Sequence, residues 1–253
     1  MKEKILAITK KRVKEKLENP DQKIINLSLI LEKLQLRINE VTELLKIITD
    51  QEYPSIDQIL TIKEYCSFYI LKNKTKEDLK ELKIDENKIN EIIDILSQKI
   101  GIVLKDEIKD ITTSLAKNIL DMIKVKEKIE TEIDILIKAN YINLYSIASP
   151  KIACKMIEIA GSFEKLARYP ASTIQLLGSE KSFFKALKFN KRTPKYGILY
   201  NHPLIINLSN RNKGRMARTI ASKISLGLKS DIGKKDISKE ILEKIKIKIS
   251  ELK

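Results

Sequence analysis

The chain has 253 residues, of which 43% are hydrophobic and 33% charged, and its formal net charge is +15. This composition excludes a disordered chain and is sufficient for one large domain or two smaller ones with a real core. No apolar run approaches the ~18 to 20 residues that a membrane span needs, and the start, MKEKILAITKKRVKEK, lacks the apolar region of a signal peptide.

The two cysteines, Cys66 and Cys154, are isolated in the sequence, with no CxxC pattern and no neighbouring histidine. This usage predicts reduced core cysteines in a cytosolic protein, and it argues against a disulfide or a metal site. No nucleotide-binding glycine loop and no Ser or Cys with a histidine base is found either. We therefore expect no catalytic residues and no cofactor.

The positive charge is concentrated in the C-terminal part. Residues 144–253 hold 23 Lys plus Arg against 8 Asp plus Glu, whereas residues 1–143 hold 26 of each class. Between Lys181 and Ser230 there are 12 basic residues and no acidic one. Because charges of one sign repel one another, a polyanionic partner is the favoured explanation, and a basic surface without a partner is the alternative.

After a basic tail or short helix over residues 1–21, apolar residues recur at alternating spacings of three and four. This pattern predicts a coiled-coil helix whose apolar seam is covered by another helix. The seam consists of Ile24, Leu27, Leu31, Leu34, Ile38, Val41, Leu45 and Ile48.

A second long helix is predicted over about 105–139, with two polar residues in its seam. One of them, Asn118, could set the register of pairing at some cost in stability. The seam consists of Ile108, Ile111, Leu115, Asn118, Met122, Val125, Ile129, Glu132 and Leu136.

Shorter amphipathic segments between these helices predict a helical tip, and Ser55 followed by Gln58 suggests a capping box at its start. No hairpin signal is found, so we expect an all-α fold with a long antiparallel coiled-coil domain over 22–143. Such helices favour a dimer through the coil, although an intramolecular pair would cover the same seam. The dimer residues are expected to be Leu27, Leu31, Leu34, Ile38, Val41, Leu45, Ile111, Leu115 and Met122.

Residues 144–253 predict a compact helical domain that ends in a C-terminal helix. Pro150 and Gly161 bracket one helix, as a first-turn proline and a C-terminal glycine. Serines are expected to begin the next three helices: Ser162 for 163–168, Ser172 for 173–177 and Ser179 for 180–188. Two amphipathic helices follow, over 213–229 and about 236–252.

Residues 178–202 combine cations with aromatic side chains. In a helix over 180–188, Lys181, Lys185 and Lys188 share one face, with Phe184 beside it. Cations fix phosphates, and aromatic or imidazole rings can stack on unpaired bases. The remaining candidates are Lys191, Arg192 and Lys195 on a loop, then Tyr196, Tyr200, Asn201 and His202.

Several of these aromatic residues have a structural alternative. Phe183 is expected in the core. For Tyr196, Tyr200 and His202, a structural role and an RNA contact remain equally open.

Two motifs stand out in this part, PASTIQLLGSEKSFF at residues 170–184 and NKGRMAR at residues 212–218. They resemble motifs of the Nop domain, the module of box C/D ribonucleoprotein scaffolds and of a spliceosomal relative. PASTIQLLGSEKSFF, residues 170–184, is similar to the family signature P-A-S-T-I-Q-x-L-G-A-E-K-A-L-F. NKGRMAR, residues 212–218, is similar to the R-G-K-x-A-R stretch. The resemblance covers about 144–233, and the helical segment 22–143 matches the coiled-coil domain of the family in length and placement.

The resemblance implies a non-catalytic RNA-binding module that assembles ribonucleoprotein particles for RNA processing. Such a module recognises a kink-turn or related guide RNA together with a bound small kink-turn protein of the ribosomal-protein type, and its coil joins two protomers. The location would be the cytosol of a prokaryote, or the nucleolus of a eukaryote. The implied RNA or ribonucleoprotein contacts are Gly178, Ser179, Glu180, Lys181, Phe184, Lys185, Lys188, Lys191, Arg192, Lys195, Asn201, His202, Arg211, Lys213, Arg215 and Arg218.

Two departures from the family pattern qualify this reading. The first departure is in length: the family's scaffold proteins carry an N-terminal domain that docks the 2′-O-methyltransferase subunit, whereas only about 20 residues precede the coil here. The chain therefore resembles a short paralogue without that domain, and we do not expect it to recruit the enzyme. The second departure is in the motif residues: the usual Ala, Leu and Arg are replaced by Ser179, Phe183 and Lys185, and the tract Asn207–Arg211 also differs from the family pattern. Because lysine does not form the forked and stacked contacts of arginine, we do not expect the RNA to be an ordinary box C/D guide.

Two other functions stay open on the sequence alone. The chain could be a dimerisation partner that regulates a full-length scaffold through its coil, in a heterodimer rather than a homodimer. It could also be a general electrostatic binder of nucleic acid, which would not depend on the kink-turn protein.

Overall fold

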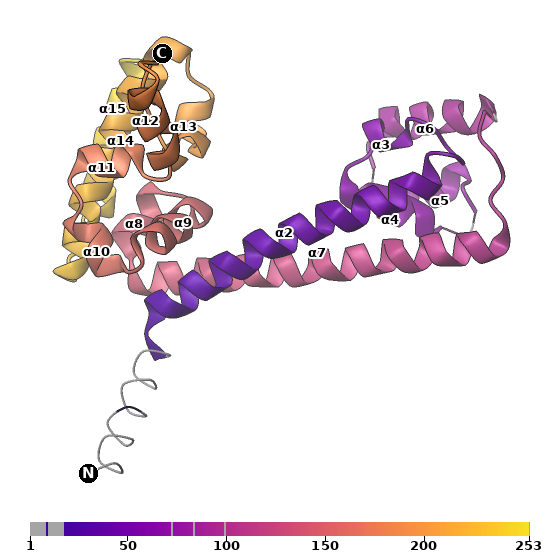
Figure 1. The fold of residues 1–253 in the computed structure, drawn as a ribbon, viewed down its shortest axis with the longest axis horizontal. Helices are drawn as coiled ribbons and strands as arrows, with labels where there is room; N and C mark the ends of the chain where they lie inside the picture. Colours follow the sequence, from indigo (N-terminus) through magenta and orange to yellow (C-terminus); the bar gives the residue numbers. More distant parts are fainter. Residues whose placement is uncertain (1–8, 10–17, 72, 83, 99, 253) are drawn as a thin grey trace. The chain divides into compact units, whose positions relative to one another are not determined.

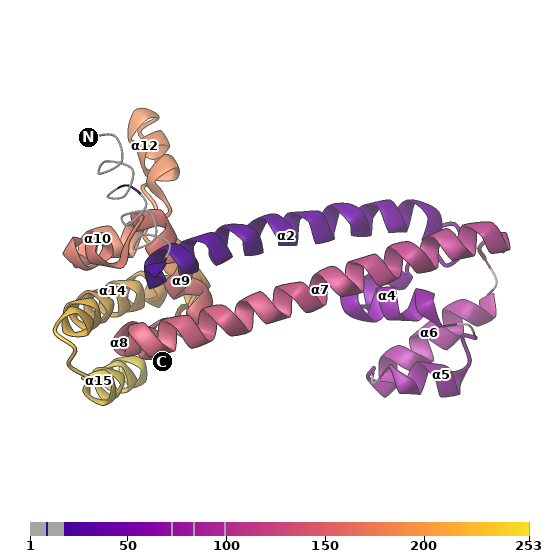
Figure 2. The ribbon, with the colours of Figure 1, turned by 90° about the horizontal axis from the view of Figure 1, so that it is seen from below.

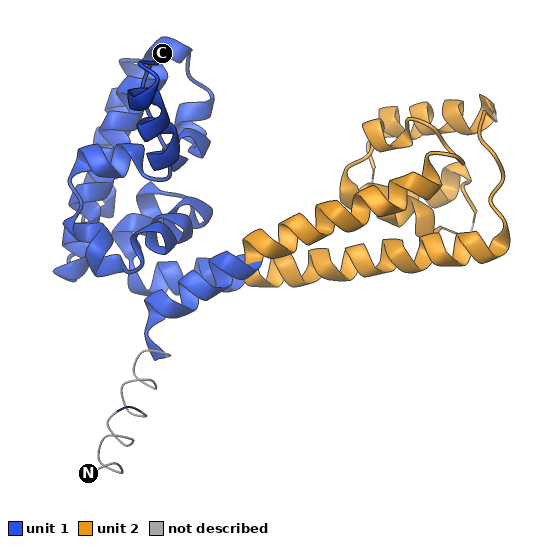
Figure 3. Ribbon diagram, in the orientation of Figure 1, with its two compact units in different colours: residues 1–30, 130–253 blue, residues 31–129 orange. Residues whose placement is uncertain are grey.

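The computed structural model describes residues 9, 18–71, 73–82, 84–98 and 100–252, and in these residues every regular element is a helix. The predicted all-α fold is therefore confirmed. The chain divides into two compact units, residues 1–30 with 130–253 and residues 31–129 (Figure 3). Both boundaries between these units fall within long helices and do not coincide with the predicted domain limits. The coiled-coil domain over 22–143 and the C-terminal domain over 144–253 therefore stay predictions. No helix of the described residues is long and apolar enough to cross a membrane.

The unit of residues 31–129 contains parts of two long helices, α2 (Pro20–Thr49) and α7 (Asp106–Asn140), which run antiparallel (Figures 1 and 2). Short helices form the tip between them: α3 (Ile56–Ile59), α4 (Ile62–Ile70), α5 (Lys76–Glu81) and α6 (Glu86–Gln98). The helical tip predicted between the two long helices is thus present.

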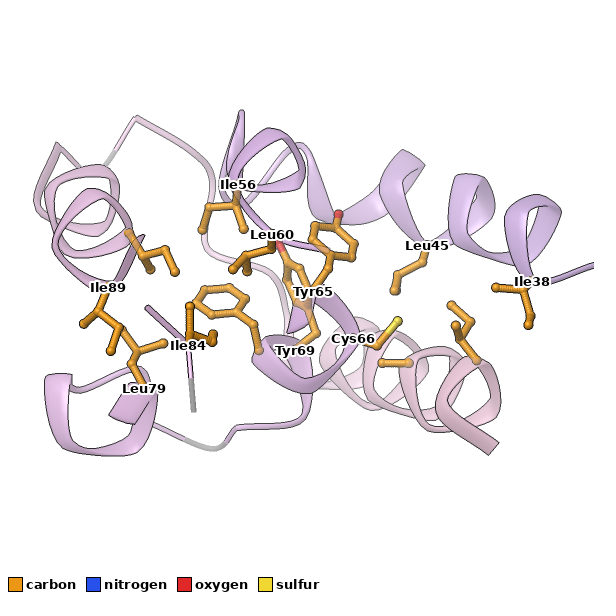
Figure 4. Close-up of a cluster of buried hydrophobic side chains, with 14 residues drawn as sticks. Ile38, Leu45, Ile56, Leu60, Tyr65, Cys66, Tyr69, Leu79, Ile84 and Ile89 are labelled. Carbon is orange, nitrogen blue, oxygen red and sulfur yellow. The ribbon is translucent and has the colours of Figure 1, made fainter. Parts of the chain in front are cut away.

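The core of this unit joins the long helices to the tip. Ile38 and Leu45 of α2 and Ile119 of α7 belong to one buried cluster with Cys66 and Phe68 of α4 (Figure 4). Both cysteines of the chain are buried, as the sequence predicted, and their thiols are free. Burial raises the pKa of the Cys66 thiol to about 12, so this side chain stays protonated and packs as a small apolar group.

The buried face of α2 is wider than the predicted seam. Ile24, Ile38 and Leu45 are buried, and the other five seam residues are half-buried. The helix also buries Thr42 and Thr49, which the apolar pattern did not reveal. Each hydroxyl donates to the backbone carbonyl four residues earlier, at 2.7 and 2.9 Å, so burial leaves neither group unsatisfied.

The buried face of α7 is displaced from the predicted seam by about one residue. The two polar members of that seam, Asn118 and Glu132, are exposed, and so are Ile111 and Val125. The prediction that Asn118 lies in the seam was wrong for packing within one chain, because Ile119 and Ile133 occupy the interior instead. The buried residues are Thr112, Ala116, Ile119, Ile133 and Ile137.

The helix starts in the tip also differ from the prediction. Ser55 precedes α3 with a left-handed φ of 72°, and its side chain makes no capping hydrogen bond. Capping boxes are found instead at Thr61 with Glu64 and at Thr75 with Asp78.

The second unit contains the C-terminal helices, with α14 at its centre. The long helix α14 (Asn210–Ile232) packs against α8, α10, α11, α13 and α15. The other elements are α8 (Ile142–Ile147), α9 (Pro150–Ala160), α10 (Phe163–Arg168), α11 (Ala171–Leu176), α12 (Glu180–Lys188), η1 (Ile198–Asn201), α13 (Pro203–Ile206) and α15 (Ser238–Ser250).

Local signals fixed several of these ends. Helix α9 spans Pro150–Ala160, and Gly161 follows it with φ 79°, as predicted. Ser162 accepts a hydrogen bond from the Lys165 amide and caps α10. Helix α11, however, begins at Ala171 after Pro170, so Ser172 does not start it.

A hydrogen-bond network around Asn143 and Asp231 holds α14 to its neighbours. The carboxylate of Asp231 accepts hydrogen bonds from the Asn143 amide and side chain and from the Leu144 amide, at 2.7 to 3.0 Å. Burial raises the pKa of Asp231, and these hydrogen bonds oppose that rise. The Asn143 side chain also bonds to the backbone of Lys235 and Ile237, so one residue connects α8, the end of α14 and the start of α15.

Candidate nucleic-acid interface

Helix α12 exposes most of its surface. It spans Glu180–Lys188, as predicted, and only Ala186 is buried. Lys181, Lys185 and Lys188 are all exposed, and Phe184 is 68% exposed. The helix projects away from α14 in Figure 2. The cations and the aromatic ring are therefore accessible to a partner.

The turn before α12 requires glycine at position 178. Gly178 has φ 82°, and an added Cβ would lie 2.5 Å from the Ile198 side chain. Its amide donates to the Glu180 carboxylate at 2.8 Å, so this backbone donor already has a partner within the chain. Ser179 does not cap α12 through its side chain, because its hydroxyl donates to the Leu176 carbonyl.

A small apolar hollow lies beside this turn. It measures about 380 Å³, and the half-buried ring of Phe183, which was expected in the core, forms part of its lining. Phe183 meets Phe184 edge to face, with ring centroids 6.1 Å apart. The lining residues are Ser172, Thr173, Leu176, Ser179, Glu180, Phe183 and Phe184.

The basic loop after α12 is tied to the end of α11. The Gly197 amide donates to the Gln175 carbonyl, and the Ile198 amide donates to the Leu177 carbonyl, both at 2.9 Å. The Gln175 side chain donates to the Lys195 carbonyl at 2.7 Å. These three bonds fix the end of the loop, while the side chains of Lys191, Arg192 and Lys195 remain exposed.

Two tyrosines and a lysine are stacked after this loop. The rings of Tyr196 and Tyr200 lie nearly parallel, with centroids 5.2 Å apart and 15° between their planes. The ammonium of Lys213 lies over the Tyr200 ring, 5.0 Å from its centroid. Tyr200 is 44% exposed, so the stack reaches the surface. The sequence placed these residues near one another in the chain but did not predict their stacking.

His202 does not lie on this surface. It is only 4% exposed, its Nε2 is 2.8 Å from the Ile147 carbonyl, and its Nδ1 accepts from the Leu204 amide at 3.2 Å. Nε2 therefore carries the proton and donates. Burial lowers the pKa of this imidazole, and the bond to Ile147 opposes the shift. The prediction that His202 contacts RNA is therefore wrong for this buried side chain, whereas its neighbour Asn201 is exposed.

The sequence did contain a signal for this role of His202. The residue stands directly before Pro203, which occupies the first turn of α13, and its side chain caps that helix. A polar residue followed by proline is typical of a helix start.

Helix α14 contributes a row of arginines. Arg211, Arg215 and Arg218 are spaced four and three residues apart and are all exposed, whereas Met216 and Ile220 face the interior. Lys213 is half-exposed on the same helix. The amphipathic character expected for this segment is thus present, with the helix extended to Asn210–Ile232.

The contacts bring together one part of the candidate set directly. The hydrogen bonds and side-chain contacts given above join four segments: Gly178, the end of the basic loop, the tyrosine pair and the start of α14. Gly214 of α14 also lies close to the Lys195 side chain. Among the described residues no cluster of three or more His, Cys, Asp or Glu side chains could hold a metal ion. The arrangement is that of an exposed basic surface with aromatic rings.

Comparison with known proteins adds the family. The model of the Nop family, described as a snoRNA binding domain, fibrillarin, matches residues 30–251. An uncharacterised NOP5 family protein of Methanocaldococcus jannaschii is 29% identical over 251 residues, which is 97% of this chain and 60% of that protein. Nucleolar protein 58 of Candida albicans is 39% identical over 129 residues, covering 51% of this chain and 25% of the relative. The chain therefore spans less than two thirds of the length of either relative.

A solved structure has a similar fold. The crystal structure of a fibrillarin/Nop5p complex matches with a TM-score of 0.58 and 24% identity, covering 100% of this chain and 77% of that one.

Proposed function

Since the chain belongs to the Nop family, we propose that it is a non-catalytic RNA-binding module that assembles ribonucleoprotein particles. The observation that carries this proposal is the set of exposed cations on α12, on the loop after it and on α14. They lie in the fifty residues 181–230, which hold 12 cations and no acidic residue. Cations in such rows bind phosphates, and nothing in the stretch offsets their charge.

The RNA we propose is a kink-turn or related guide RNA that carries a small kink-turn protein of the ribosomal-protein type. The family motifs at 170–184 and 212–218 support this choice, because the first reaches into α12 and the second lies on α14, two of the elements that carry the exposed cations. Recognition of RNA and protein together would make binding depend on both. The location we propose is the cytosol of a prokaryote or the nucleolus of a eukaryote, since the relatives above come from both kinds of organism.

A second function, pairing through the coil, is favoured by apolar side chains that the unit of residues 31–129 leaves exposed. Leu36, Leu44 and Ile47 of α2 are 55 to 66% exposed, and Ile111 of α7 is 53% exposed. Exposed aliphatic side chains of this size on a long helix are suited to a second helix pair. We therefore propose a homodimer or a heterodimer with a full-length family member.

Binding to a kink-turn RNA, measured with and without the small kink-turn protein and at two salt concentrations, tests the main proposal. We expect tight binding only to the preformed complex. Equal, steeply salt-dependent binding in both cases would show a general polyanion surface. Absent RNA binding, together with stable pairing to a full-length relative, would favour a regulatory partner.

Two variants locate the interface. Lys181→Ala and Arg218→Ala should each weaken binding several-fold and reduce the salt slope by roughly 0.9, the value for one lost phosphate contact on a duplex. Lys80→Ala is the matched control, because Lys80 is an exposed lysine on α5 in the unit of residues 31–129. An equal loss in the control and the two variants would contradict this placement of the interface.

A further inference from the structure

The tyrosine pair beside the basic loop has features that core packing does not require. Tyr200 is 44% exposed, although its ring stacks on Tyr196. The Lys213 ammonium lies over the Tyr200 ring, 5.0 Å from its centroid. A ring that is stacked, exposed and approached by a cation resembles the base platforms of single-strand-binding proteins.

Hydrogen bonds to Gln175 of α11 fix the backbone beside the two tyrosines. Tyr196 directly follows Lys195, whose carbonyl accepts from the Gln175 side chain, and Gly197 bonds to the Gln175 carbonyl. Tyr200 lies in the short helix η1, which begins one residue later. Because both rings are attached to backbone fixed on α11, little conformational freedom is lost when a ligand stacks on them.

The surroundings favour a nucleotide over an apolar ligand. Lys213 supplies a cation at the Tyr200 ring. The exposed Lys195 directly precedes Tyr196 in the chain, and the exposed Asn201 directly follows Tyr200. An amide side chain can both donate to and accept from a base edge. An apolar ligand on the rings, such as a lipid, would instead remove these polar and charged groups from water without offering hydrogen bonds in return, which is unfavourable.

We propose that Tyr196, Tyr200 and Lys213 form a stacking site for one unpaired base of the bound RNA. The inference rests on the proposed function for the source of the RNA, and it adds a contact that base-paired RNA cannot make. The base stacks on the Tyr200 ring in the place of the Lys213 ammonium. The flexible lysine side chain then turns to the phosphate of the same nucleotide, so that a charge contact replaces the cation–ring contact.

Fluorescence can report this stacking directly, because the chain contains no tryptophan. Tyr200→Trp keeps a stacking ring and introduces a single fluorophore, which a stacked base quenches. Tyr169→Trp is the matched control, since Tyr169 is a half-buried tyrosine at the end of α10. Each variant is titrated with the kink-turn RNA carrying its small protein and, separately, with a uridine heptamer, while anisotropy of the labelled RNA follows binding.

We expect quenching in Tyr200→Trp and little change in Tyr169→Trp. Replacing the unpaired nucleotides by abasic ones, one at a time, should abolish the quenching at one position. In parallel, Tyr200→Leu should weaken binding roughly 5- to 150-fold, the range typical of a lost base–aromatic stack, whereas Tyr200→Phe should stay within about twofold of the original protein. The penalty of Tyr200→Leu should disappear on the RNA with the decisive abasic position.

The outcomes separate this inference from the proposed function. Binding of both RNAs without quenching in Tyr200→Trp overturns the stacking site and leaves the RNA-binding module intact. Quenching by the heptamer without binding of the kink-turn complex supports the stacking site and overturns the proposed RNA. Absence of binding to either RNA overturns both.

Discussion

At the residue scale, the surroundings of His202 connect a single protonation equilibrium to stability. The imidazole is buried and neutral, since one ring nitrogen accepts from the Leu204 amide and the other donates to the Ile147 carbonyl. A second proton would have to enter at the nitrogen that now accepts, and it would break the cap of α13. Burial therefore places the pKa of His202 below its ordinary value of 6.5.

The sign of the resulting pH dependence follows from this lowered pKa. Well above pH 6.5 the imidazole is neutral in both the folded and the unfolded chain, and the folded state keeps its full stability. As the pH falls below 6.5, the unfolded chain takes up the proton before the folded one, so the free energy of unfolding decreases. For one group the slope cannot exceed about 1.4 kcal/mol per pH unit.

Urea unfolding at pH 7.5 and 5.5 tests this. His202 is the only histidine of the chain, so the difference between the protein and His202→Gln isolates its contribution. We expect the original protein to lose more stability than the variant on acidification. An equal loss in both would show that His202 titrates normally, in contradiction to its burial.

At the element scale, local and long-range information contributed differently to what the sequence could predict. Pro150 and Gly161 fixed α9 because a first-turn proline and a left-handed glycine act within a few residues of the helix end. The buried face of α7 was less predictable, since Ile108, Leu115 and Met122 lie at its edge while Ile111 lies outside it. Only the packing against the tip and α2 decides between two such neighbouring rows.

The candidate site shows the same division. The exposure of Lys181, Lys185 and Lys188 followed from helix periodicity and charge, both readable in the sequence. The burial of His202 depends on Ile147, 55 residues earlier in the chain, and the tyrosine stack depends on Lys213. No periodicity reveals contacts of this kind, so residues that are adjacent in the sequence, Asn201 and His202, were grouped although they face opposite environments.

Two glycines test how tightly the basic loop is fixed to α11. At Gly197 an added Cβ would lie 1.9 Å from the Leu177 carbonyl oxygen, so the backbone must separate there. At Gly214, in the helix α14, the same Cβ would meet only the Lys195 side chain at 3.6 Å, an ordinary contact. The two positions are therefore a matched pair with opposite expectations.

We expect Gly197→Ala to lower the free energy of unfolding by ~1–3 kcal/mol, the usual cost of forcing a side chain into a packed site. Gly214→Ala should raise it by ~0.5–1 kcal/mol, because alanine is the better helix former. Thermal and urea unfolding of the two variants measure this. A Gly197→Ala protein as stable as the original would mean that the loop is not held against α11.

At the scale of the whole molecule, charge and apolar surface are divided along the chain. The net charge of residues 144–253 is +15, whereas residues 1–143 are neutral overall. The exposed aliphatic side chains of α2 and α7 in the unit of residues 31–129 lie in the neutral part. One part of the chain is thus suited to a polyanion, and the other can approach a second copy without strong repulsion.

Pairing through this neutral part can be separated from folding by two substitutions on α2. Leu44 is 55% exposed, whereas Ile38 is 2% exposed and belongs to the core of its own unit. If the exposed row joins two chains, Leu44→Glu should convert a dimer to a monomer and leave the monomer folded, because a charge then replaces apolar area at the interface. Ile38→Ala should instead lower the stability of the unit by ~2–5 kcal/mol through the cavity that it creates.

Sedimentation over a range of concentrations, together with circular dichroism, distinguishes the two effects. A Leu44→Glu protein that remains dimeric would place the contact on the half-buried seam around Leu34, which would then have to open to receive the partner.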